Sequence, residues 1–163
     1  MKNYIFIATF FMAFIGFAQT TIMEVDSFSK IKIDADAQVE IVYSPKDQVI
    51  FNVNEDQLKN FTISSDNGSL SIQQNGTAIS GLKIRIYTNQ LKGMAVNGSG
   101  NVTLTKFNSM QSLYLSMKGS YTVNTGTAKI KNFTISRDAN SKAIHENTVE
   151  VKESVNGSLL VTN

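Results

Sequence analysis

The stretch of residues 82–104, LKIRIYTNQLKGMAVNGSGNVTL, decides the expected fold. Its first part alternates apolar and polar residues, with Leu82, Ile84 and Ile86 on one side, which is the period of a strand with one buried face. A second short strand then leads into the segment Asn97-Gly98-Ser99-Gly100-Asn101. The two glycines of that segment permit positive φ angles, so the chain can turn a sharp corner before the apolar alternation resumes. The expected unit is therefore a strand, a corner and another strand.

The same unit recurs weakly along the rest of the chain, in residues 94–104, 113–123, 133–144 and 149–161. Its expected corners are Asn97-Gly98-Ser99, Lys118-Gly119-Ser120, Arg137-Asp138-Ala139-Asn140 and Asn156-Gly157-Ser158. The units start about 20 residues apart, a spacing typical of solenoid coils that bury one another's edges. We therefore expect an all-β fold, a right-handed parallel β-helix or solenoid with short irregular coils. An antiparallel β-sandwich with similar turn spacing is the structural alternative.

The first part of the expected domain also has strand patterns. Residues 28–43 keep a nearly strict alternation, which places Asp34 and Asp36 together on the polar face of a strand. Residues 54–59 fit either one helical turn or an irregular loop, and Asp66-Asn67-Gly68-Ser69 is typical of a hairpin turn. No stretch has a convincing 3.6-residue period, so essentially no helix is expected.

Residues 1–18 have the features of a signal peptide. Lys2 gives a positive start, residues 4–17 are almost wholly apolar, and Gly16 and Ala18 suit a cleavage site before Gln19. The apolar run is shorter than the roughly 20 residues of a membrane span, although a retained anchor is the alternative. Because the chain has no cysteine, attachment through a lipid-modified cysteine is not expected, and neither are disulfides. We expect residues 19–163 to form a single all-β domain in the periplasm or at the cell surface, without a membrane span after cleavage.

The charges are unevenly distributed around a net charge of +2. Residues 67–137 contain no acid, and their bases are Lys83, Arg85, Lys92, Lys106, Lys118, Lys129, Lys131 and Arg137. Such a band can attract anionic polymers, or it can consist of solvated lysines on exposed strand faces. Nucleic acid is not an expected partner, because the chain is expected to be exported.

Few residues suggest catalytic chemistry. His145 is the only histidine, so a zinc site or a histidine-based triad is not expected, and an exposed loop position is. Asp34 and Asp36 could bind calcium or act as paired carboxylates, or they could simply aid solubility. Ser99, between Gly98 and Gly100, lacks the flanking pattern of a nucleophile elbow. We expect no catalytic, cofactor-binding or metal-binding residues, and the sequence does not locate a binding surface.

Several of these patterns together resemble a known family. They are residues 28–41, Leu58, the segment Asn67-Gly68-Ser69-Leu70-Ser71-Ile72, and residues 82–102 through Gly98-Ser99-Gly100. In these the chain is similar to the family called putative auto-transporter adhesin, head GIN domain, most closely over residues 28–104. The resemblance implies an exported cell-envelope protein of Gram-negative bacteria with a β-helical, solenoid-like fold, and its name implies adhesion. No catalytic residues carry over from the family.

The expected function is a non-catalytic binding or adhesion module rather than an enzyme. Its expected partner is a cell-surface glycan or an envelope protein, and no cofactor is expected. Two alternatives remain at this point. One is a polysaccharide-active β-helix enzyme with acids clustered on one sheet, and the other is a structural envelope protein without a ligand.

Overall fold

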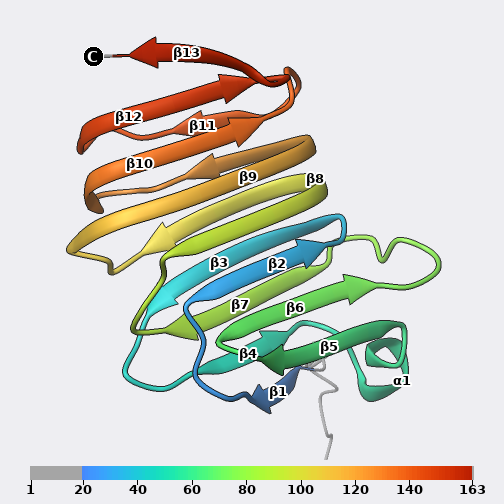
Figure 1. Ribbon diagram of the computed structural model, residues 1–163. Helices are drawn as coiled ribbons and strands as arrows, with labels where there is room; N and C mark the ends of the chain where they lie inside the picture. Colours follow the sequence, from blue (N-terminus) through green and yellow to red (C-terminus); the bar gives the residue numbers. More distant parts are fainter. Residues whose placement is uncertain (1–19, 163) are drawn as a thin grey trace, which may run out of the picture.

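The computed structural model describes residues 20–162, so the expected signal peptide and its cleavage site lie outside the described residues. The described chain forms thirteen strands and one short helix (Figure 1). In chain order they are β1 (Thr21–Glu24), β2 (Lys30–Asp34), β3 (Ala37–Tyr43), β4 (Gln48–Phe51), α1 (Glu55–Leu58), β5 (Phe61–Asp66), β6 (Ser69–Gln74), β7 (Lys83–Thr88), β8 (Gly93–Thr105), β9 (Ser109–Asn124), β10 (Lys129–Arg137), β11 (Lys142–Ile144), β12 (Thr148–Val155) and β13 (Ser158–Thr162).

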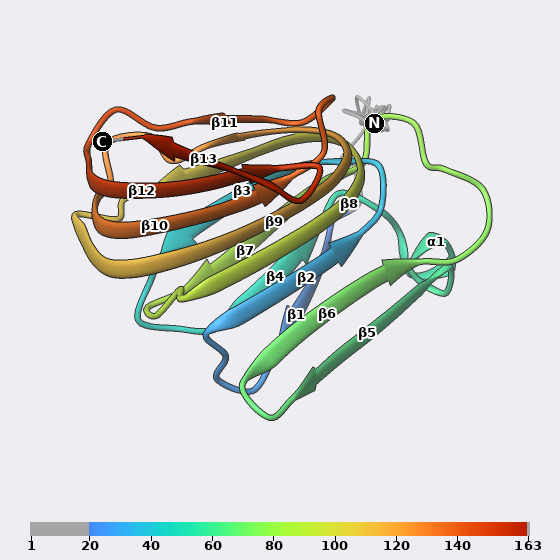
Figure 2. The same ribbon diagram turned by 45° about the horizontal axis from the view of Figure 1, so that its top comes forward.

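The strands form one mixed sheet that folds over into two layers (Figure 2). One layer has the order β5-β6-β2-β8-β9-β10-β12-β13, and the other has the order β1-β4-β7-β3-β8-β9-β11. Strands β8 and β9 belong to both layers, because each bends midway and continues in the second one. The side chains between the two layers form the hydrophobic core.

The middle of the sheet is a stack of bent, parallel strands. Strands β2 and β3 stack on the two halves of β8, with Ile31 opposite Met94 and Val39 opposite Val102. Strand β8 stacks in turn on β9, which pairs with β10 and β11. From β8 onward, residues that pair between successive strands of this stack are about 20 positions apart in the sequence, which is the spacing of the sequence pattern.

The prediction of an all-β fold is confirmed, but a β-helix or solenoid is not. The sheet does not close, because β1, β5, β11 and β13 each pair with a neighbour on one side only. Antiparallel pairs flank the parallel stack at both ends, since β1 pairs with β4, β5 with β6, and β12 with β13. The antiparallel sandwich does not describe the fold either, because the central pairs are parallel.

The corners of the stack require glycine. Gly98 and Gly100 have φ angles of 115° and 141°, which side-chain-bearing residues rarely adopt. A Cβ atom on Gly100 would lie 1.9 Å from the carbonyl oxygen of Ala37 in the neighbouring strand β3. A Cβ atom on Gly119 would lie 2.2 Å from the carbonyl oxygen of Gly98 in β8. The glycines therefore allow the backbones of successive strands to approach one another closely.

Two expected features of the turns are wrong. Residues 28–43 form two strands instead of one, because the chain bends at Ala35 and Asp36 between β2 and β3. The segment at Asn156 and Gly157 is a hairpin turn between the antiparallel strands β12 and β13 rather than a corner of the stack. The hairpin predicted at Asn67 and Gly68 is confirmed, between β5 and β6.

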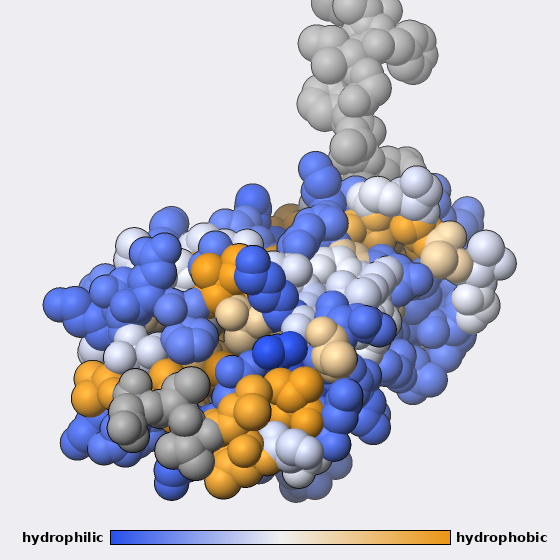
Figure 3. Space-filling model, turned by 90° about the horizontal axis from the view of Figure 1, so that it is seen from above, coloured by the Kyte–Doolittle hydropathy of each residue, from blue (hydrophilic) through white to orange (hydrophobic). Residues whose placement is uncertain are grey.

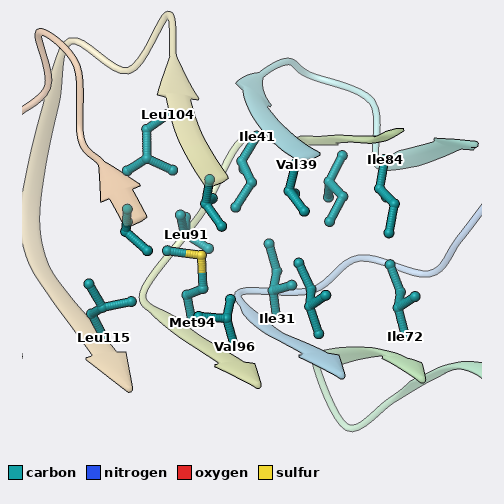
Figure 4. Packing of buried hydrophobic residues seen from close by; sticks show 14 of the residues in the cluster. Ile31, Val39, Ile41, Ile72, Ile84, Leu91, Met94, Val96, Leu104 and Leu115 are labelled. Carbon is teal, nitrogen blue, oxygen red and sulfur yellow. The ribbon is translucent and has the colours of Figure 1, made fainter. Parts of the chain in front are cut away.

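The core consists of alternate residues from both layers (Figure 4). Ile31 and Ile72 from one layer face Val39 and Ile84 from the other, and all four are buried. Burial of one such side chain contributes about 1.5–3 kcal/mol. The opposite, outward face of each strand is then left for polar residues, and this face carries the candidate site.

Candidate functional site

A groove of about 490 Å³ runs over the outward face of the second layer. We call it the outer groove. Most of its walls are side chains from four neighbouring strands and the residues beside them, and the full lining is Thr20, Gln38, Val39, Glu40, Ile50, Asn52, Lys83, Ile84, Arg85, Asn101 and Thr103.

The strand register assembles the polar side chains of the outer groove into rows. Gln38 of β3 pairs with Lys83 of β7 on one side and with Asn101 of β8 on the other. Two residues further along β3, Glu40 pairs in the same way with Arg85 and Thr103. Because side chains alternate along a strand, both rows point outward, away from the core.

An ion pair lies in the second row. The Arg85 Nε atom donates a hydrogen bond to Glu40 Oε2 at 2.6 Å, and the Thr105 hydroxyl donates one to Glu40 Oε1 at 3.2 Å. The hydrogen bond to Glu40 raises the pKa of Arg85, and Tyr87 adds to the effect. Arg85 is therefore positively charged at any physiological pH, and both oxygens of Glu40 have donors.

The first row supplies amides and an ammonium group. Asn101 Nδ2 donates to Gln38 Oε1 at 3.0 Å, which orients both amides. At the edge of the groove, Asn52 accepts a hydrogen bond from the backbone N–H of Lys83 at 2.6 Å. The side chain of Lys83 is exposed and takes part in none of the ion pairs formed within residues 20–162. The groove thus presents oriented donors and acceptors that can bind hydroxyl or carbonyl groups.

The prediction that Asp34 and Asp36 lie on the face of a single strand is wrong. Asp34 ends β2 and Asp36 lies in the bend, so they do not share one strand face. Each carboxylate instead binds the neighbouring strand, β8. Asp34 accepts a hydrogen bond from Asn97 Nδ2 at 3.0 Å. Asp36 accepts two hydrogen bonds from Ser99, one from its backbone N–H at 2.7 Å and one from its hydroxyl at 2.8 Å. Both carboxylates therefore hold the corner together.

His145 is half-buried, contrary to the expected exposed position. Its ring packs edge-on against Phe133, with centroids 5.4 Å apart, and its Nδ1 lies 3.0 Å from the hydroxyl of Thr148. Across residues 20–162 no group of three or more histidine, aspartate or glutamate side chains is placed to hold a metal ion. The same part of the chain contains no helix long and apolar enough to cross a membrane.

Sequence reasoning did not find the outer groove. Its polar residues alternate with core residues and read locally as an ordinary solvated strand face. Only the pairing of strands distant in sequence, such as Glu40 with Arg85 at a separation of 45 positions, brings them together. The charge pattern gave one signal, since Lys83 and Arg85 belong to the basic segment.

Apolar side chains also gather at the end of the sheet where β13 lies (Figure 3). There Val149 of β12 and Leu159 of β13 are 74% and 66% exposed. Leu160 is 46% exposed. These three side chains are not part of the buried core and form an exposed apolar patch at this end of the stack.

The mixed, two-layered β-sheet defines an all-β domain. The family described as putative auto-transporter adhesin, head GIN domain, matches residues 27–158, and the chain belongs to this family. The resemblance noted in the sequence is thereby confirmed.

Solved structures share the fold at low sequence identity. A putative adhesin from Bacteroides fragilis NCTC 9343 matches with a TM-score of 0.70 and 13% identity, over 82% of this chain and 64% of its own. A putative lipid binding protein from Parabacteroides distasonis ATCC 8503 matches with a TM-score of 0.64 and 16% identity, over 84% of this chain and 67% of its own. A putative adhesin from Parabacteroides merdae ATCC 43184 has a TM-score of 0.54 and 15% identity, over 84% and 75%.

The chain spans less than two thirds of the length of the Bacteroides fragilis protein. No curated protein matches the sequence. The family and these structural relatives are described as adhesins or binding proteins and not as enzymes.

Proposed function

We propose that this protein is an exported, non-catalytic binding module of the cell envelope, and that it engages its ligand through the outer groove. The observation that carries the proposal is the state of Glu40. It is the only acidic residue among the described residues that line the groove, and Arg85 and Thr105 donate to its two oxygens. Glycoside hydrolysis ordinarily requires two carboxylates that flank the bond to be broken, and this surface offers one that is already bound.

The partner that suits the groove is a cell-surface glycan or an envelope protein. Gln38 and Asn101 hold each other's amides in place and keep further donor and acceptor positions for a ligand. Lys83 and Arg85 add positive charge beside them. Membership of a family named for adhesion supports the same class of function.

The proposal is tested by binding of residues 19–163 to an array of bacterial and host glycans and to an envelope-protein extract. We expect Asn101→Ala and Arg85→Gln to weaken capture by the array or the extract by about tenfold, with unchanged circular dichroism. Lys59→Gln is the matched control, because Lys59 is an exposed residue beside α1 and outside the groove. Equal capture by the wild-type protein and both groove variants would contradict the proposal.

Lipid binding is the second candidate. Ile22 of β1 is 60% exposed and pairs with Ile50 of β4, which lines the groove, so an apolar strip adjoins the polar rows. One relative of the same fold is described as a putative lipid binding protein. Flotation with phospholipid vesicles separates the two candidates, because Ile22→Ser would abolish flotation while leaving glycan capture unchanged.

A further inference from the structure

A second concavity, of about 350 Å³, lies at the strand ends opposite the glycine corners. We call it the loop pocket. It is formed by the end of β3, the β7–β8 loop, the β8–β9 loop and the start of β9. Its lining residues are Tyr43, Asn89, Gln90, Leu91, Lys92, Lys106, Phe107, Asn108, Ser109, Met110, Gln111 and Ser112. None of them lines the outer groove.

An aromatic pair forms the apolar part of the loop pocket. Phe107 is buried, and its ring meets that of Tyr43 edge to face, with centroids 5.7 Å apart and planes at 79°. Tyr43 is nevertheless 48% exposed. The pair therefore holds a tyrosine ring in a fixed position at the surface, where the C–H face of a sugar ring can pack against it and a hydroxyl can bond to its polar end.

The charge of the loop pocket is positive. Lys92 and Lys106 line it, both are exposed, and neither takes part in the ion pairs formed within residues 20–162. No aspartate or glutamate is among its described lining residues. A third lysine, Lys129, begins the next strand of the stack, β10. Its backbone N–H donates to the carbonyl of Asn108 at 3.2 Å, so it lies beside the pocket. A surface with unpaired lysines attracts anions.

The backbone of Lys106 is held in an unusual conformation. Its φ angle is 64°, and the other two non-glycine residues with positive φ in residues 20–162 are Asn67 and Asn156, both in Asn-Gly turns. Asparagine and glycine adopt this conformation more readily than lysine. Because strained positions often mark functional sites, a lysine here suggests that its side chain is needed.

The loops that carry these side chains are tied down before any ligand binds. The backbone N–H of Lys92 donates to the carbonyl of Ser29 at 2.8 Å, and its own carbonyl accepts from the N–H of Tyr114 at 2.9 Å. Gln90 Nε2 donates to the hydroxyl of Ser27 at 3.2 Å. A prearranged site loses less entropy when it binds a ligand.

We infer that the loop pocket binds an acidic polysaccharide, with one sugar ring packed on Tyr43 and its carboxylate between Lys92 and Lys106. Asn108 and Gln111 line the same pocket and are exposed, and their amides can donate hydrogen bonds to ring hydroxyls and accept hydrogen bonds from them. This site goes beyond the proposed function and does not depend on it, because it shares no residue with the outer groove.

The test is a titration of residues 19–163 with oligogalacturonate, followed by calorimetry at low salt. We expect binding that weakens as the salt concentration rises, since exposed charges are screened. Lys106→Asn should weaken it by about threefold, as expected for one exposed charge. Tyr43→Ala should weaken it by roughly fivefold or more through loss of the aromatic contact. Lys106→Asn should at the same time keep or raise the melting temperature, because asparagine suits the positive φ better.

The matched control is Lys118→Asn, the same change of charge at a glycine corner, away from the strand ends that form the loop pocket. Lys118 pairs there with Asn97 of β8. The control variant should leave the affinity for oligogalacturonate unchanged. Three results would overturn the inference: no binding of oligogalacturonate, an equal loss in Lys118→Asn, or a loss in the groove variant Arg85→Gln instead of the pocket variants. Binding to vesicles of anionic phospholipid without binding to oligogalacturonate would also overturn it.

Discussion

The hydroxyl group of Tyr121 donates a hydrogen bond to the carbonyl oxygen of Ala35 at 2.6 Å, although the two residues are 86 positions apart. Ala35 lies in the bend between β2 and β3, and Tyr121 follows the corner of β9, with β8 stacked between them. Tyr121 is fully buried. The bond therefore links three successive levels of the stack, the β2–β3 bend, β8 and β9, from inside the corner, where no water can replace it.

Removal of this hydroxyl group tests its role. We expect Tyr121→Phe to lower the free energy of unfolding by about 1–3 kcal/mol, because the buried carbonyl of Ala35 would lose a partner. Urea unfolding followed by circular dichroism measures the change. Tyr114→Phe is the control, since Tyr114 is 52% exposed, and it should have almost no effect. Equal stabilities of the two variants would show that the Tyr121–Ala35 bond contributes nothing.

The same residue predicts how stability depends on high pH. Burial raises the pKa of Tyr121 to about 12, and a hydrogen bond from the backbone of Ala37 opposes part of this rise. In the unfolded chain a tyrosine has a pKa of about 10. Its contribution to stability is therefore complete below about pH 10 and is lost as the pH rises toward 12. Wild-type stability should fall more steeply over this window than that of Tyr121→Phe, and parallel curves would contradict the assignment.

The corner glycines should differ sharply from the hairpin glycines. Gly100→Ala should lower the melting temperature most, because its Cβ would meet the carbonyl of Ala37. Gly98→Val should lower the melting temperature more than Gly98→Ala, because a β-branched side chain is harder to place there. Gly68→Ala is the matched control. Gly68 also has a positive φ, of 72°, but a Cβ there meets nothing within 4 Å. Gly68→Ala should therefore lower the free energy of unfolding only by the backbone penalty of about 1–2 kcal/mol. If thermal denaturation gave Gly68→Ala and Gly100→Ala the same loss, close stacking would not be the reason for glycine.

The two ion pairs between strands should contribute differently to stability. Arg137 and Glu153 face inward near the end of the core, and their side chains are 21% and 16% exposed, whereas those of Arg85 and Glu40 are 53% and 37% exposed. Glu40→Gln should therefore lower the free energy of unfolding by at most about 1 kcal/mol. Glu153→Gln should lower it by more than that, up to several kcal/mol. Chemical denaturation of both variants gives the comparison. A larger effect of Glu40→Gln would contradict it.

Local patterns predicted much of the fold. The alternation of Leu82, Ile84 and Ile86 correctly identified buried positions, and Asn67 with Gly68 correctly identified a hairpin. These features depend on residues close together in sequence. The bend between β2 and β3 was missed because Ile33, Ala35 and Ala37 are all buried, so the alternation continues through it without a glycine or a proline.

The candidate site could not be predicted in the same way. The pairing of Gln38 with Asn101 and of Glu40 with Arg85 follows from which strands become neighbours. An alternating pattern specifies which face of a strand is polar, but not which strand lies beside it. The antiparallel pairing of β1 with β4 was missed for the same reason.

Export is tested on the protein made by its own host. The intact mass of the exported chain should correspond to a start at Gln19, with or without cyclisation of that residue. An uncleaved chain in the membrane fraction would contradict both the signal peptide and the proposed location.

The central claim is that the protein binds without catalysis, and one experiment tests it most directly. Residues 19–163 are incubated with a panel of polysaccharides, and retention of each polymer and the release of new reducing ends are measured in the same samples. We expect retention of at least one polymer, weakened by Asn101→Ala, with no new reducing ends. Release of reducing ends that Asp34→Asn or Asp36→Asn abolishes in a folded protein would contradict the claim.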